Sequence, residues 1–94
     1  MNSVSVIEQS EHYFVLSGEL NRHSVPSIKL PKVAANNQIT LDLEKLNQVD
    51  TAGLAWLIDT LSQLQRNHIS LTLVNLPEQL KKLMKLGDVE NLFE

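Results

Sequence analysis

The chain has 94 residues, of which 43% are hydrophobic and 20% charged, and its net charge is −3 at pH 7. This length and composition predict one small domain, residues 1–94, and the acidic balance gives no reason to expect nucleic-acid binding. Because the sequence lacks cysteine, a basic leader and any apolar run of ~20 residues, we exclude disulfide scaffolds and thiolate sites and expect a cytoplasmic protein that does not insert into a membrane itself.

The first third of the chain predicts a hairpin followed by a helix. Two short apolar runs, residues 4–6 and 13–16, flank a polar stretch and predict a β-hairpin that ends at Ser17-Gly18. Ser24 can cap a helix over residues 24–33, and Pro26 suits its first turn. Pro31 lies inside that helix, where a proline costs ~3 kcal/mol, so we expect the helix to be short, kinked or split.

The remaining elements alternate between strands and helices. Apolar residues at every second position of 39–43 predict a strand, with Leu46 and Val49 tucked against it from a loop. Residues 51–67 carry apolar side chains at steps of three and four and predict an amphipathic helix. A strand over 69–74, a helix over 77–86 and a short final turn complete the chain. This order predicts an α/β fold, with a small mixed sheet of about four strands flanked by three to four helices.

The candidate functional residues lie at the start of the long helix. Asp50 is placed to be the N-cap, so that the hydroxyl of Thr51, in the first helical position, can face water, a partner or a phosphate. Ala52 and Gly53 are small and let another surface approach closely. The alternative is that Asp50-Thr51 is only a good helix start and that Gly53 relieves packing inside the fold.

Trp56, the single tryptophan of the chain, projects nearly opposite the inward-facing side of this helix at ~100° per residue. We therefore expect it to be substantially exposed, as protein-binding hot spots are. The alternative is that a neighbouring helix covers Trp56, leaving it in the core.

The strand 41–43, the segment Asp50-Thr51-Ala52-Gly53-Leu54 and the strand 71–73 resemble the STAS domain of sulfate-transporter tails and anti-sigma-factor antagonists, over about residues 13–93. Within that family, residues 49–55 and the run 16–20 are most similar to the small STAS subunit of the Mla phospholipid transporter of Gram-negative bacteria. Pro31 departs from the family pattern, as does Lys29, which stands where an aromatic contact is expected.

The resemblance implies a STAS-like fold without catalysis or cofactor, which acts by docking. In antagonist relatives the residue matching Thr51 is usually a serine that a kinase phosphorylates, whereas in Mla-type relatives the matching threonine contacts the cytoplasmic ATPase subunit of an ABC transporter. Threonine followed by alanine favours the second group. The resemblance thus implies an accessory subunit, peripheral on the inner membrane through a complex with ATPase and permease. The alternative is an anti-sigma-factor antagonist switched by phosphorylation of Thr51.

An enzyme is the third hypothesis. No Gly-rich loop ends in Lys-Ser or Lys-Thr, and the three histidines are scattered without the spacing of metal ligands. Asp42 and Asp50 are the carboxylates that could pair for acid–base chemistry, but neither has an obvious histidine partner. We therefore expect no catalytic or metal site.

Lys81, Lys82 and Lys85 form a basic cluster on the helix after Pro77. Such a cluster is usually the solvated face of an amphipathic helix. The alternative is contact with anionic lipid headgroups, where each lysine contributes ~1 kcal/mol.

Overall fold

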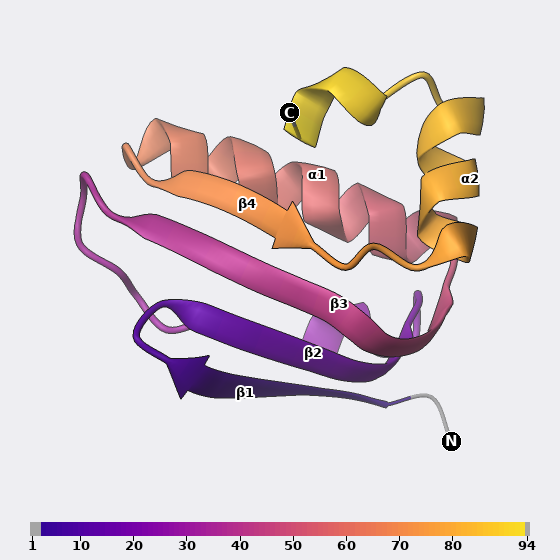
Figure 1. Ribbon diagram of the computed structural model, residues 1–94, viewed down its shortest axis with the longest axis horizontal. Coiled ribbons are helices and arrows are strands. Elements are labelled where there is room, and N and C mark those ends of the chain that lie inside the picture. The colour runs from indigo at the N-terminus through magenta and orange to yellow at the C-terminus, as the bar shows by residue number, and fades with distance from the viewer. Residues whose placement is uncertain (1–2, 94) are drawn as a thin grey trace.

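The computed structural model describes residues 3–93. Its four strands form one mixed sheet in the order β1-β2-β3-β4, in which β1 runs antiparallel to β2 and the other two pairs are parallel. Figure 1 shows α1 running along the sheet and α2 standing across one end of it. The predicted α/β fold with about four strands is therefore confirmed. The elements are β1 (Val4–Ser10), β2 (Tyr13–Leu20), the 3-10 turn η1 (Val25–Ser27), β3 (Gln38–Val49), α1 (Thr51–Arg66), β4 (Ser70–Val74), α2 (Glu78–Leu86) and the 3-10 turn η2 (Glu90–Phe93).

The hydrophobic core lies between the sheet and the helices. Alternate residues of β2 and β3 are buried, which is the pattern of strands with one covered face. The helices therefore cover one face of the sheet, and the other face carries half-buried and exposed side chains. The buried apolar residues include Phe14, Leu16, Leu20, Ile39, Leu41, Leu43, Leu46 and Val49 of the sheet, Leu54, Leu57 and Leu61 of α1, and Leu80 and Met84 of α2.

Strand β3 is longer than the sequence pattern predicted. It continues through Leu46 and Val49, which are buried as expected but belong to the strand itself and not to a loop. The reason is that the register between β2 and β3 shifts twice, between Val15 and Ser17 and between Gly18 and Glu19. Each irregularity breaks the two-residue alternation, so the spacing of buried residues changes to three beyond Leu43.

Of the short, kinked or split helix expected over residues 24–33, only a short turn forms, and the predicted cap by Ser24 is wrong. The structure has only the three-residue turn η1 there, and Ser24 makes no capping hydrogen bond; its hydroxyl donates to the carbonyl of Glu19 (2.6 Å). Pro31 lacks an N–H group and disfavours helical geometry at the residue before it, so the segment after η1 is irregular. The described residues thus contain two α-helices and two 3-10 turns, fewer helices than the three to four expected.

Candidate functional site

Asp50 joins the end of β3 to the start of α1 and caps the helix as predicted. Its backbone is extended, and its Oδ1 accepts a hydrogen bond from the N–H of Gly53 (2.9 Å). Its own N–H donates to the carbonyl of Leu20 (3.2 Å), which ties the helix start to the end of β2. One free N–H group of the first turn is thereby satisfied, and the carboxylate lies at the positive end of the helix.

Thr51 is the first residue of α1 and is exposed. Its side chain borders a hollow of about 450 Å³ between the helix start and the turn that follows β2. Ala52 is half-buried and lines the same hollow. The helix start therefore offers a hydroxyl and a methyl group on an open surface.

The turn beside Thr51 carries polar residues that the sequence analysis did not assign to the site. Asn21 Nδ2 donates to Gln48 Oε1 (2.9 Å), and Asn21 Oδ1 accepts from the N–H of His23 (2.9 Å). Arg22 and His23 line the hollow with Thr51 and are exposed. Asn side chains often accept hydrogen bonds from the backbone two residues further on, and such bonds form turns. Asn21, followed by Ser24, could therefore have indicated this turn in the sequence.

Gly53 is buried inside the fold, not on the surface. A Cβ at this position would collide with the carbonyl oxygen of Leu20 and touch the Leu20 side chain. The absence of a side chain lets α1 lie directly on the end of β2. Gly53 therefore relieves packing inside the fold, which is the alternative given in the sequence analysis.

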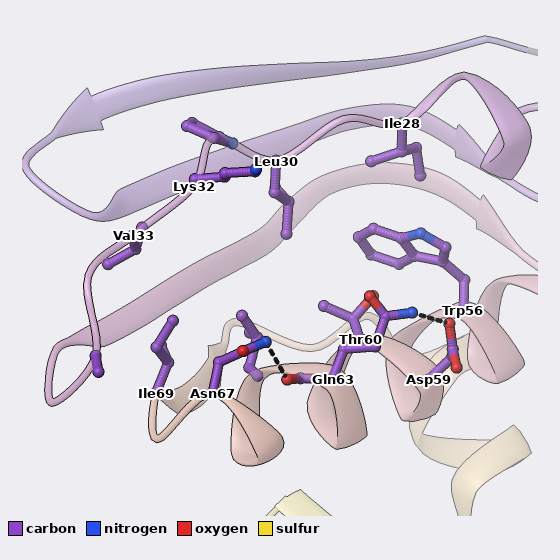
Figure 2. Close-up of a pocket in the computed structure, with 13 residues that line it drawn as sticks. Ile28, Leu30, Lys32, Val33, Trp56, Asp59, Thr60, Gln63, Asn67 and Ile69 are labelled. Atoms are coloured by element: carbon purple, nitrogen blue, oxygen red, sulfur yellow. Dashed lines mark hydrogen bonds between the residues drawn. The ribbon is translucent and has the colours of Figure 1, made fainter.

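Trp56 is half-buried and packs against the core, so the expected substantial exposure is not found. Asp59 and Gln63 lie on the same side of α1 and line the same groove. That side is partly covered by the irregular segment 28–35, and the indole lies in the groove between the segment and the helix (Figure 2). The covering element is this segment, not a second helix.

The Thr51 and Trp56 side chains point in different directions. Five helical residues separate them by ~7.5 Å along the axis and by ~140° around it, whereas Ala52 and Trp56 are only ~40° apart. A partner that touched both would have to follow the helix surface from its first turn, across Ala52, to the indole.

Asp42 and Asp50 do not form a catalytic pair. Eight residues of extended chain separate them by roughly 26 Å. Asp42 lies on the open face of the sheet, where it accepts hydrogen bonds from the Tyr13 hydroxyl (2.7 Å) and Asn75 Nδ2 (3.2 Å). Burial raises the pKa of Asp42, but hydrogen bonds from the Glu44 N–H, Tyr13 and Asn75 outweigh it and hold the pKa below its ordinary value.

The histidines and the lysine cluster lie away from the start of α1 in the sequence. Among residues 3–93, no group of three or more His, Cys, Asp or Glu side chains could hold a metal ion. Lys81, Lys82 and Lys85 lie on the exposed side of α2, and Lys81 pairs with Glu78 at 3.5 Å, a contact of little energetic consequence at the surface. No helix within the described part of the chain is long and apolar enough to cross a membrane.

Comparison with known proteins identifies a family and relatives in fold. Residues 6–94 match the family described as "Mlab, STAS domain". Among solved structures, the anti-sigma factor antagonist SpoIIAA in its unphosphorylated form is similar to this chain, with a TM-score of 0.61 and 16% sequence identity, over 89% of this chain and 83% of that one. At this identity the likeness shows the fold alone. The curated proteins contain no significant match.

Proposed function

Because the chain belongs to the MlaB-type STAS domain family, we propose that it is a non-catalytic accessory subunit that docks on the ATPase of an ABC phospholipid transporter. The observation that carries the proposal is the family match, which spans residues 6–94 and bears the Mla name. In this role the protein is cytoplasmic and reaches the inner membrane only through its complex with ATPase and permease. It needs no cofactor and serves the lipid asymmetry of the outer membrane.

The proposed docking site comprises Asp50, Thr51, Ala52, Gly53 and Trp56, of which Gly53 lies beneath the surface. The exposure of Thr51 and its place beside a hollow support a contact there. Asp50 and Gly53 contribute from within, because the cap and the close packing on Leu20 fix the helix start. Trp56 extends the surface along α1, where an aromatic side chain supplies contact area at low entropic cost.

Docking can raise ATPase activity without any chemistry in this chain. A partner that binds the assembled, active ATPase more tightly than the inactive one shifts the equilibrium toward the active form by that difference in affinity. A rigid helix start suits this task, because a surface that is ordered before binding loses little entropy on docking.

Purification of the tagged protein from membranes and cytosol tests this proposal. A flexible linker belongs between an N-terminal tag and the chain, because the start of β1 pairs with the end of β2, where the carbonyl of Leu20 accepts from the N–H of Asp50. Co-purification of an ATPase together with a permease is the expected result. Recovery of a small kinase-like anti-sigma factor instead would contradict the proposal.

A second candidate function is a phosphorylation switch on an anti-sigma factor. It is supported by the likeness in fold to an anti-sigma factor antagonist and by the exposed hydroxyl of Thr51. A phosphate would bring about −1.5 to −2 charges, attracted by the helix N-terminus and repelled by Asp50. Incubation with ATP and cell lysate, followed by intact-mass measurement, tests it: a species heavier by one phosphate that Thr51→Ala abolishes is the expected result.

A further inference from the structure

Strand β1 forms an open edge of the sheet. Figure 1 shows α1 and α2 toward β4, and β1 at the opposite margin, with no helix or strand of the described residues beyond it. The edge at β4 is different, because Leu92 and Phe93 of η2 lie beside that strand. An edge strand presents unpaired N–H and C=O groups with which another chain can pair.

A backbone hydrogen bond at the start of β1 shows which of its residues bond to β2. The N–H of Glu19 donates to the carbonyl of Ser3 (2.8 Å), and these two residues lie opposite each other in the register that pairs Val4 with Gly18. In an antiparallel ladder, hydrogen-bonded pairs alternate with pairs that make no hydrogen bond to each other. The odd-numbered residues of β1 therefore bond to β2, and the N–H and C=O groups of the even-numbered residues point outward.

The outward-facing residues in the regular part of the strand are Val4, Val6 and Glu8. Beyond the ladder with β2, no backbone hydrogen bond within residues 3–93 involves them. The register shifts after Glu8, and such a bulge bends a strand and ends its regular pairing. Residues 4–8 contain no proline and no lysine, which are common means of protecting an edge strand. This short stretch is therefore open to a second strand.

The outward groups of this stretch are self-complementary about a two-fold axis. When two β1 strands run antiparallel with Val6 opposite Val6, Val4 of each copy lies opposite Glu8 of the other. All the outward N–H and C=O groups of the regular stretch then find partners, in about six hydrogen bonds. A two-fold axis at Ile7 would instead place Val4 opposite Ser10, beyond the bulge, and leave it without a regular partner.

The side chains of β1 suit the same arrangement. Ile7, with an exposed fraction of 61%, lies opposite Ser5 of the second copy and diagonally beside the other Ile7. On the opposite face of the sheet the two Val6 side chains meet. The two Glu8 residues are offset by about 13 Å along the strands, beyond the ~8–10 Å screening length, so their like charges do not oppose the pairing. Each Glu8 carboxylate also accepts a hydrogen bond from the N–H of His12 in its own chain (3.0 Å).

We infer that two copies of this chain associate through β1, so that their two sheets join into one continuous sheet. Strand β1 has 7 residues, whereas a standard interface uses ~20–30 residues a side, so the dimer is weak and depends on concentration. Each dimer carries two copies of the start of α1. The inference goes beyond docking at Thr51, because it assigns a second surface to the protein and a second copy of the chain as its partner.

Disulfide trapping tests the register, because the chain contains no cysteine. In the proposed pair, Ser5 and Ile7 of the two copies have Cα atoms ~4.5 Å apart, which a disulfide can bridge. Ser5→Cys protein mixed with Ile7→Cys protein in a glutathione buffer should form at least tenfold more mixed dimer than either forms alone, because identical positions lie beyond the ~7 Å limit. The control mixture of Ser62→Cys with Gln65→Cys, on the exposed side of α1, should show no such excess.

Sedimentation velocity between ~10 and ~500 μM measures the association without cross-linking. Ile7→Lys places two like charges at the contact and should weaken association at least tenfold. The matched control Leu86→Lys changes a side chain on α2 with an exposed fraction of 85% and should alter association less than twofold. Circular dichroism checks that both variants are folded.

Hydrogen exchange of the unmodified protein gives a readout that does not depend on how the variants fold. At high protein concentration the amides of Val4, Val6 and Glu8 should exchange more slowly, whereas those of Ser5 and Ile7, which already bond to β2, should change less. A monomer at all concentrations, no excess of mixed disulfide, equal effects of the two lysine variants, or unchanged exchange of the outward amides would each overturn the inference. None of these experiments contains an ATPase, so their failure is distinct from failure of the proposed docking function.

Discussion

Gly53 of α1 lies directly on the carbonyl oxygen of Leu20, the last residue of β2. Gly53→Ala would place a methyl group against that oxygen, so the helix start would have to move away from the sheet. Overpacking of this kind costs ~1–3 kcal/mol, more than the ~1 kcal/mol that alanine otherwise gains over glycine within a helix. We therefore expect urea denaturation to show a lower free energy of unfolding for Gly53→Ala.

Gly87 provides the matched control for this substitution. It follows α2 with a φ of −86°, and a Cβ there would lie 3.5 Å from the Leu83 carbonyl, an ordinary contact. Gly87→Ala should therefore change the free energy of unfolding by less than ~0.5 kcal/mol. Equal effects of the two substitutions would show that the contact between Gly53 and Leu20 is not what requires glycine.

The cap of α1 makes a second prediction about stability. Asp50→Ala removes the acceptor of the Gly53 N–H and should lower the free energy of unfolding by ~1 kcal/mol. Asp50→Asn keeps a capping oxygen and should retain most of that stability. Guanidinium denaturation of both variants measures the difference, and a loss as large for asparagine as for alanine would mean that charge, not the hydrogen bond, supports the helix start.

The sequence predicted those parts of the fold that follow from local periodicity. The buried side of α1 and the cap by Asp50 are set by residues close together in the chain, and the structure confirms both. The length of β3 could not be predicted in this way, because its buried positions beyond Leu43 depend on irregular pairing with β2. The turn at Asn21 was also missed, because the second strand was expected to end at Ser17-Gly18 and instead continues to Leu20.

The environment of Trp56 shows the limit of the same approach for the site. Helical spacing gave the direction of the indole correctly but contained no information on what lies opposite it. The segment that covers Trp56 was expected to be helical, and Pro31 instead leaves it irregular. The groove therefore arises from the part of the chain where the sequence pattern was weakest.

The hydrogen bond from Tyr13 to Asp42 predicts a pH-dependent contribution to stability. It raises the pKa of Tyr13 above 10.0, whereas the pKa of Asp42 lies below 3.8 despite its burial. Asp42 thus contributes stability above its ordinary pKa that is lost as the pH falls, and Tyr13 contributes stability below its ordinary pKa that is lost as the pH rises. Tyr13→Phe should therefore lower the free energy of unfolding most at pH values between the ordinary pKa of Asp42 and that of Tyr13.

NMR titration of the Asp42 carboxyl tests whether the hydrogen bond from Tyr13 helps to lower the pKa of Asp42. Tyr13→Phe removes one hydrogen bond to the carboxylate, so the pKa of Asp42 should rise toward its ordinary value. Carboxyl groups far from the open face of the sheet should titrate identically in both proteins. An unchanged pKa of Asp42 would contradict the prediction, since the remaining donors would then account for the whole effect.

Thr51→Glu tests the docking surface without disturbing the fold. Thr51 is exposed, and a carboxylate in the first turn is favourable toward the helix dipole, so thermal denaturation should show unchanged or slightly raised stability. At a contact with a partner, the same change adds bulk and a charge beside Asp50, and we expect co-purification with the ATPase to be lost. Thr51→Ser keeps the hydroxyl and should retain it.

Ser62→Glu is the control, because it introduces the same charge on the exposed side of α1, ~16 Å along the helix from Thr51. A folded Ser62→Glu protein should bind the ATPase as the unmodified chain does. If Thr51→Glu also bound fully, the ATPase would have to dock elsewhere. If both variants lost binding, the contact with the ATPase would have to extend along α1 as far as Ser62, because exposed charges ~16 Å apart lie beyond the ~8–10 Å screening length and do not act on one site together.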